Sequence, residues 1–265
     1  MNPRKRNRAG KKGMRRTRSY QDRELKLLWG MAAARCAFPD CQIVLVAPPT
    51  KSDPSVVLGQ VSHIVGLEDD GPRGDPAYPD SLRNKYENLI LLCPGHHSLV
   101  DGQDSSYSTD TLKNWKVAHE RWVLMTLAAQ MPRVSFAELE FVTNAMTSNP
   151  CPPTESFVLV PPKEKMERNG LTAHVGSLLT MGLAKSQEVA AFIERAADID
   201  PEFPERLKGR FVAEYIKHRN SGLSGDALFQ ELRVLASRGS QAFEKQAAGI
   251  AVLSYLFEKC EVFES

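Results

Sequence analysis

The stretch from Asn88 to Asp101 constrains the fold of this chain more than any other, because it places metal-binding side chains at the turn between a strand and a helix. Residues 89–92 are Leu-Ile-Leu-Leu, a run typical of a short buried strand. The run ends at Cys93, and the Pro-Gly pair that follows predicts a turn. A helix is expected after the turn, and two adjacent histidines, His96 and His97, stand at its start.

The two histidines are expected to serve different centres. Cys93 and His96 are three residues apart, close enough to share one metal ion. His97 points elsewhere, because neighbouring residues on a helix do not face the same way. In a helix at 95–104, His97 and Asp101 lie at positions i and i+4 and therefore share one face. The segment thus offers ligands to two different centres.

Two cysteines upstream, Cys36 and Cys41, flank a turn that contains a proline. Such a turn brings both thiolates to about 2.3 Å from one zinc ion, although buried inert thiols are the simpler explanation of the pair alone. Together with Cys93 and His96 they make a Cys₃His set of soft ligands with no place for water, which predicts a closed structural zinc site. Such a site stabilises a small domain with too little core of its own.

Composition bounds the class of protein. The chain has 265 residues, of which 42% are hydrophobic and 25% charged, as in one large or two modest globular domains. We find no apolar run long enough for a membrane span and no signal-peptide pattern. The five cysteines form an odd set whose spacing suits metal better than disulfides. We therefore expect a cytoplasmic protein that does not contact a membrane.

The chain is expected to divide into four segments. The first segment, residues 1–19, has nine Lys or Arg and no acidic residue among its first eighteen positions. This composition predicts a disordered arm that either binds the phosphates of a nucleic acid or only increases solubility. The third segment, residues 131–163, has five prolines within fifteen residues near its end, which predicts a linker. The segments are a basic arm at 1–19, a first domain at 20–130, a helix with a Pro-rich linker at 131–163, and a helical domain at 164–265.

Within the first domain, helices are predicted at 20–35 and about 110–130, and strands at 42–47 and 56–65. The apolar stripe expected on the second helix comprises Leu112, Trp115, Ala118, Trp122 and Met125, which leaves His119 in solvent. Alternation along the second strand places His63 on one face and Ser62 on the other.

His63, Asn88 and His97 are left over once the zinc ligands are assigned. A lone histidine on a strand is more often structural than catalytic, but here all three residues flank one turn. A histidine that takes a proton from water, beside a hard cation held by histidine and oxygen ligands, is what hydrolysis of a phosphodiester requires.

At these residues the sequence resembles the HNH (ββα-metal) endonucleases. The resemblance covers roughly residues 25–121 and rests on the four zinc ligands, on 62–64, on 88–93 and on His97. The loop at 71–75 and the segments 100–101 and 110–115 are similar to HNH domains of bacterial anti-phage effectors. The resemblance implies an α+β fold in which a zinc-stapled ββα-metal HNH domain precedes an all-α C-terminal domain.

The resemblance also implies roles. His63 would be the general base, Asn88 the residue that positions it, and His97 a ligand of a catalytic Mg²⁺ or Mn²⁺, with double-stranded DNA as the substrate. Many family members carry an acidic or histidine ligand where this chain has Ser62. Ser62 itself, Gln60, Asp101 or a water is then the candidate for the second ligand.

The C-terminal segments 222–229 and 251–263 resemble the C-terminal domain of effectors in Lamassu-like, ABC-type three-component defence systems. This implies docking to an SMC-like ABC ATPase and a middle subunit, and assembly into a homo-oligomer; a plain helical accessory domain is the alternative. The last helix, 243–263, is apolar on several faces and is either central to the bundle or in an interface. We expect Leu256 and Phe257 to pack against another chain.

Two other functions use similar zinc-binding residues. The first is a non-catalytic zinc-knuckle module that binds nucleic acid or protein. The joint presence of His63, Asn88 and His97 favours the nuclease, because a structural zinc ribbon needs none of them. A zinc deaminase is excluded, because the chain has neither a His-x-Glu pair nor a Pro-Cys-x-x-Cys motif.

Overall fold

The computed structural model describes residues 16–144, 147, 162–259 and 262–263. Most of the predicted basic arm and most of the Pro-rich linker lie outside these residues. The described chain has an α+β fold, as predicted, with small sheets near its start and many helices. In its first half the elements are α1 (Asp22–Met31), β1 (Val46–Ala47), β2 (Val56–Val57), β3 (Gln60–His63), α2 (Asp80–Arg83), η1 (Tyr86–Asn88), β4 (Leu89–Leu92), α3 (Pro94–Gly102) and α4 (Thr109–Gln130).

The second half of the described chain is helical. Its elements are η2 (Met131–Arg133), α5 (Phe136–Asn144), α6 (Pro162–Arg168), α7 (Ala173–Leu183), α8 (Ser186–Ile199), α9 (Phe203–Asn220), α10 (Gly225–Ala236) and α11 (Phe243–Glu258). We call residues 16–108 the N-terminal lobe and α5 to α11 the helical lobe. None of the helices in the described ranges is long and apolar enough to cross a membrane.

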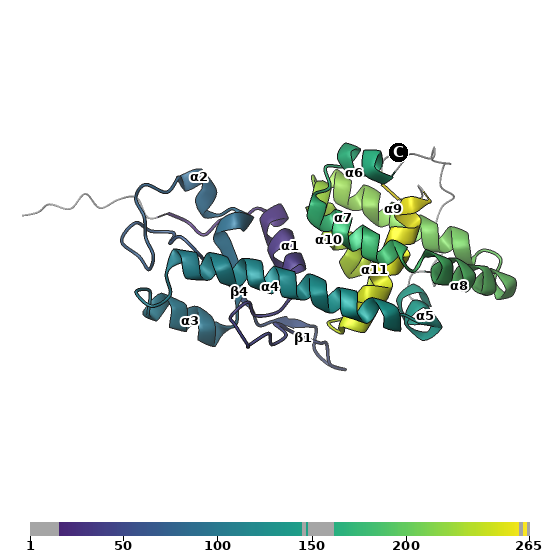
Figure 1. The fold of residues 1–265 in the computed structure, drawn as a ribbon, viewed down its shortest axis with the longest axis horizontal. Coiled ribbons are helices and arrows are strands. Elements are labelled where there is room, and N and C mark those ends of the chain that lie inside the picture. The colour runs from purple at the N-terminus through teal and green to yellow at the C-terminus, as the bar shows by residue number, and fades with distance from the viewer. Residues whose placement is uncertain (1–15, 145–146, 148–161, 260–261, 264–265) are drawn as a thin grey trace, which may run out of the picture.

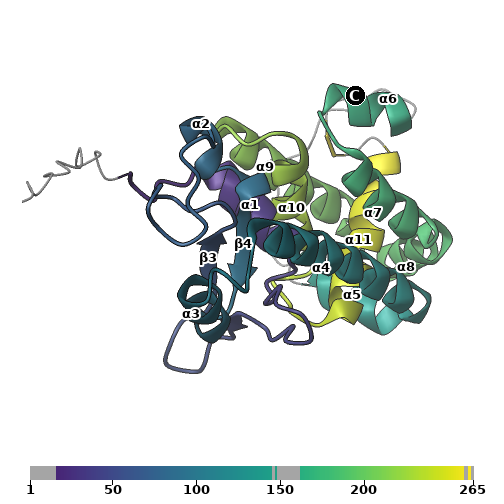
Figure 2. The same ribbon diagram turned by 60° about the vertical axis from the view of Figure 1, so that its left-hand side comes forward.

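The central sheet of the N-terminal lobe pairs β3 with β4 in antiparallel register, with His63 opposite Leu89 and Ser62 opposite Ile90. All four side chains of β4 are buried, as its unbroken apolar run predicts. Cys93 ends the strand, and α3 starts at Pro94, a residue that suits the first helical position. Figure 2 shows β3 and β4 side by side, with α3 close to them.

The predicted strand at 56–65 is split in two. β2 pairs with β1 in a separate short sheet, and β3 pairs with β4. Gly59 lies between β2 and β3, where a Cβ atom would come within 2.7 Å of the Trp29 ring. The chain therefore passes close to α1 at this point. This close approach is possible because Gly59 has no side chain.

Two hydrophobic cores meet along α1 and α4. One core surrounds β4 and includes Leu28, Leu45 and Leu112. The other fills the helical lobe but also includes Leu27 of α1 and Val123 of α4. Figure 1 shows α4 as the long helix that runs from the side of α3 to α5. The predicted domain boundary at residue 130 thus falls at the end of a helix that packs on both lobes.

The face that α4 buries differs from the predicted stripe. Its buried residues are Leu112, Lys116, His119, Val123 and Leu127, whereas Met125 is 63% exposed. Lys116 is accommodated because its ammonium group lies 3.5 Å from the centre of the Tyr86 ring and 2.8 Å from Glu120. The expectation that His119 is solvated is wrong, since its Nε2 lies 3.1 Å from the carbonyl oxygen of Ala32 inside the protein.

Helix α11 is central to the helical lobe. It packs against α4, α5, α7, α8 and α10, which explains why it is apolar on several faces. Leu256 is 2% exposed and Phe257 1% exposed within the single chain. The expectation that these two residues pack against another protein chain is therefore wrong. Helix α5, predicted as part of the linker segment, also packs on α11 and α8.

The Leu256→Ala variant is expected to lower the free energy of unfolding by about 2–5 kcal/mol, because it leaves a cavity in a closely packed core. Denaturant unfolding of the full chain measures this loss. Ile199→Ala is the control, since Ile199 is 85% exposed and its truncation should change stability by about 0.5 kcal/mol at most. If Leu256→Ala left the stability unchanged but altered the mass of the protein assembly in solution, Leu256 would have to lie in an interface with another chain.

Candidate metal centre and hydrolytic site

The four predicted zinc ligands come together in the N-terminal lobe. One ligand atom from each of Cys36, Cys41, Cys93 and His96 lies within 4.8 Å of the other three. The His96 Nδ1 atom is 3.2 Å from the Cys93 Sγ and 3.6 Å from the Cys36 Sγ. Three sulfurs and one imidazole nitrogen at such spacing fit the tetrahedral coordination of Zn²⁺. This part of the prediction is confirmed as a cluster that can hold zinc.

Local backbone contacts hold the cysteine turn against the sheet. Cys36 follows the turn that ends α1, and the Ala37 amide donates to the Leu91 carbonyl oxygen at 2.9 Å. Asp40 and Gln42, on either side of Cys41, have φ angles of 60° and 47°. Left-handed backbone is uncommon at residues other than glycine, so the turn is shaped for its ligands at some conformational cost.

Aromatic rings pack against the ligand histidine. The Phe38 ring stacks on His96, with ring centres 3.7 Å apart and planes at 3°. Trp115 of α4 in turn packs against Phe38 in a T-shaped contact, with ring centres 4.8 Å apart. The stack fixes the plane of the imidazole and leaves its Nδ1 directed at the sulfurs, which is the orientation that a zinc ligand needs.

Burial also affects the thiols. It raises the pKa of Cys36 to about 12, and the amide of Cys93, which donates to its sulfur at 3.3 Å, opposes this only in part. Zinc binds the thiolate, so a bound dication would supply the positive charge that this buried site otherwise lacks. The donor set and its surroundings therefore fit a structural zinc ion.

His63 lies at the end of β3 and is 6% exposed. Its Nε2 atom is 2.9 Å from the Asn84 Oδ1, and the Tyr20 ring stacks on it with centres 5.7 Å apart. Desolvation lowers the pKa of His63, and the hydrogen bond with Asn84 partly opposes this. A lowered pKa keeps the ring neutral at pH 7, the state in which a histidine can accept a proton.

Asn88 clamps the backbone that follows His63. Its Oδ1 accepts from the Val65 amide at 2.8 Å, and its Nδ2 donates to the carbonyl oxygens of Val65 at 3.0 Å and Arg83 at 2.9 Å. These bonds occupy the oxygen and both amide hydrogens. Asn88 therefore positions the loop after β3, while the atom bonded to the His63 ring belongs to Asn84.

His97 and Asp101 share one face of α3, with 3.8 Å between the His97 Nδ1 and the Asp101 Oδ2. Both also act electrostatically on His63. Ser62 and Gln60 sit on the other side of β3 from His63, because successive strand residues face opposite ways. Of the candidates for the second ligand, Asp101 is thus the side chain that lies beside His97.

Sequence reasoning missed the part played by Arg73. Its side chain is 3% exposed, and its guanidinium donates to Asp101 at 2.5 Å and to the carbonyl oxygens of His63, Ile64 and Val100. Arg73 therefore ties the end of β3 to α3 and holds the two halves of the site together. An arginine in a loop rich in glycine and proline gives no local signal of burial, and nothing in the sequence separates it from a solvated residue.

A second arginine, Arg83, organises the loop between β3 and β4. It is 1% exposed and donates to the carbonyl oxygens of Gly66, Asp75 and Tyr78. It also pairs with Asp69 at 2.8 Å. Through these bonds the long loop after β3 is folded back on the start of β4, which places Asn84 next to His63.

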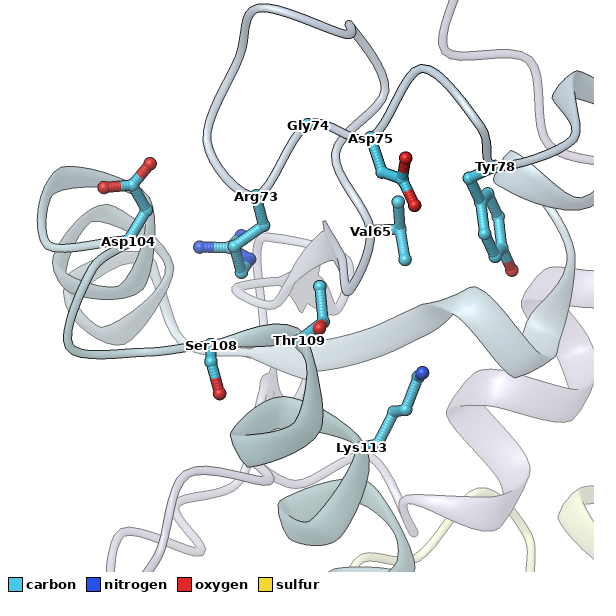
Figure 3. Close-up of a pocket in the computed structure, with 9 residues that line it drawn as sticks. All are labelled: Val65, Arg73, Gly74, Asp75, Tyr78, Asp104, Ser108, Thr109 and Lys113. Carbon is cyan, nitrogen blue, oxygen red and sulfur yellow. The ribbon is translucent and has the colours of Figure 1, made fainter.

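Figure 3 shows a pocket that is lined by Arg73, by other residues of the loop after β3 and by residues at the start of α4. Its lining includes Asp75, Asp104 and Lys113, so its charges are of mixed sign. None of the residues predicted to be catalytic line it, and the guanidinium of Arg73 is engaged by the bonds above. The pocket is therefore not assigned to phosphate binding.

Comparison of the chain with protein-family models gives no match, and comparison with curated proteins gives none either.

Proposed function

We propose that this protein is a metal-dependent HNH endonuclease that hydrolyses phosphodiester bonds of double-stranded DNA. The observation that carries the proposal is that Arg73 binds both His63 and Asp101, while His97 lies beside Asp101 and directly follows His96 of the Cys₃His cluster. The order β3, β4, α3, with the base at the end of the first strand and the metal ligands on the helix, supports a ββα-metal arrangement.

The proposed chemistry assigns a role to each group. The neutral His63 ring takes a proton from a water molecule, whose oxygen attacks phosphorus while the bond to the leaving sugar oxygen breaks. A Mg²⁺ or Mn²⁺ ion at His97 and Asp101 would supply positive charge for the phosphate and the leaving oxygen. Arg73 binds the backbone of both β3 and α3 and keeps them at a fixed separation, and Asn88 holds the backbone that follows β3.

A zinc-knuckle module that only binds nucleic acid or protein is the second candidate. The Cys₃His cluster favours it as much as it favours the nuclease. The two differ in what they need at His63 and His97, because a binding module has no use for a buried neutral histidine that interacts electrostatically with a candidate metal-ligand pair. Cleavage of DNA therefore separates them.

His97→Ala is expected to abolish Mg²⁺- or Mn²⁺-dependent conversion of supercoiled plasmid to nicked or linear DNA at metal concentrations that saturate the wild type. The loss should exceed the roughly 10–100-fold typical of an outer-sphere partner, because a direct ligand is removed. The assay follows band intensities over time at several metal concentrations.

Two controls accompany this assay. His218→Gln removes a histidine that lies beside Glu214 on α9 and should leave cleavage unchanged. Both variants should retain one zinc per chain, because the zinc ligands are untouched. A wild-type chain that never cleaves DNA, or an active His97→Ala variant, would refute the assignment.

We further propose that the protein is the nuclease effector of an anti-phage defence complex, regulated through its helical lobe by an SMC-like ABC ATPase and a middle subunit. Contacts between α10 and α1 support such a coupling. Arg233 donates to the Gly30 carbonyl oxygen at 2.6 Å, and Glu231 pairs with Lys26 at 2.7 Å. Mass in solution, measured for the chain alone and with each partner, tests both the complex and a homo-oligomer.

A further inference from the structure

Asn84 is the residue whose side chain meets the His63 ring. It follows α2 directly and lies before η1, in the loop that Arg83 folds onto the start of β4. The Asn84 Oδ1 is 2.9 Å from the His63 Nε2. The resemblance to HNH endonucleases implies the positioning role for Asn88, but the oxygen and both amide hydrogens of Asn88 are engaged by backbone groups.

The orientation of the Asn84 amide is set by a second contact. Its Nδ2 donates to the Thr17 carbonyl oxygen at 3.3 Å. A flipped amide would instead place two oxygens, both acceptors only, against each other. The amide oxygen therefore faces the imidazole of His63.

This orientation determines which ring nitrogen of neutral His63 carries the proton. An amide oxygen can only accept, so the Nε2 must donate and must hold the hydrogen. A neutral imidazole has one proton on its two nitrogens, which leaves the Nδ1 with a free lone pair. The nitrogen able to take a proton from water is then the Nδ1.

The surroundings keep this arrangement in place. Arg16, the neighbour of Thr17, pairs with Asp69 at 2.9 Å and Asp80 at 2.8 Å, which fastens the Thr17 segment to the loop before Asn84. On its face the imidazole is covered by the Tyr20 ring, stacked at an interplanar angle of 30°. The ring thus has one hydrogen bond in its plane and one aromatic neighbour across it.

We infer that Asn84 is the positioning residue of the hydrolytic site, accepting the Nε2 hydrogen of His63 so that the Nδ1 is the basic atom. The inference rests on the proposed nuclease function, in which His63 is the base. It separates two tasks: Asn88 holds the backbone after β3, and Asn84 holds the ring and selects its tautomer.

A matched pair of variants tests the kinetic consequence. Asn84→Leu keeps the approximate size but removes the acceptor, and should lower kcat for plasmid cleavage about 10–100-fold with KM for DNA unchanged. Asn84→Asp keeps an acceptor oxygen for the Nε2 hydrogen but replaces the donor to Thr17 by a second acceptor, so kcat should recover only to within about threefold of the wild type, the cost of losing that one hydrogen bond. An Asn84→Leu enzyme with wild-type kcat overturns the inference, and so does an Asn84→Asp enzyme as slow as Asn84→Leu.

The nitrogen chemical shifts of the His63 ring give a readout that needs no activity. In mildly alkaline buffer the wild type should show a protonated Nε2 and an unprotonated Nδ1, and Asn84→Leu should show a mixture of tautomers. A wild-type ring protonated at the Nδ1 overturns the inference even if Asn84→Leu does not fold. If the wild type shows the expected tautomer but does not cleave DNA, the nuclease proposal fails while the assignment of Asn84 stands.

Discussion

Cys93→Ser is expected to unfold the N-terminal lobe rather than only to weaken it. Cys93 and Cys36 are 8% and 0% exposed and belong to the same core as β4. Structural zinc sites contribute about 10–16 kcal/mol of apparent binding free energy, whereas whole domains are stable by about 5–15 kcal/mol. The loss of one thiolate therefore removes an interaction as large as the stability of the lobe itself.

Metal analysis, together with far-ultraviolet circular dichroism during denaturation, measures this effect. The wild type should hold one zinc per chain, and Cys93→Ser should hold none and lose the cooperative transition of the N-terminal lobe. Cys151→Ser is the matched control, since Cys151 lacks ligand spacing in the sequence and its loss should leave zinc content at one per chain. A soluble, zinc-free Cys93→Ser protein with the wild-type transition would show that the cluster is not a structural metal site.

His63→Ala is expected to slow DNA cleavage by about 10²–10⁴-fold, the usual contribution of a general base. Zinc content should stay at one per chain, because His63 is not among the cluster ligands. The rate of plasmid cleavage under saturating Mg²⁺ or Mn²⁺ gives the comparison.

The matched control for this variant is His119→Ala. His119 has the same exposed fraction as His63, 6%, and is hydrogen-bonded to backbone, so its removal tests the effect of losing a buried imidazole without touching the site. His119→Ala should lower stability but leave the cleavage rate of the folded enzyme near wild type. If His63→Ala cleaved DNA as fast as the wild type, a different group would have to be the base.

The sequence by itself determined the parts of the site that depend on local spacing. Cys93 and His96 meet because a strand, a turn and one helical turn separate them, and each of these is encoded by the residues in between. The same holds for the pairing of His97 with Asp101 on α3, which the helical repeat alone predicts. Cys36 and Cys41 could be added because a Cys₃His set needs two more soft ligands.

The environment of His63 was decided by tertiary structure. Asn84, Arg73 and Tyr20 reach the site from separate segments of the chain. Asn84 and Tyr20 stand in no pattern that marks them, and the similarity of the loop at 71–75 to HNH domains does not predict that Arg73 is buried. An asparagine in a polar stretch is equally compatible with solvent and with a buried hydrogen bond. Which of Asn84 and Asn88 contacts the ring depends on how the loop folds on Arg83, and that fold rests on contacts between residues distant in sequence.

The packing of the helices also divides into features that the sequence predicts and features that only the tertiary structure decides. The periodicity of α4 and α11 predicted helices correctly, since helix formation follows from a local repeat. It did not predict which face α4 buries, because Lys116 becomes an interior residue once the Tyr86 ring and Glu120 lie beside it. Nor did it decide between a central and an interfacial α11, because an apolar surface is stabilised equally by its own chain or by another, and only the three-dimensional arrangement of the other helices determines which one covers it.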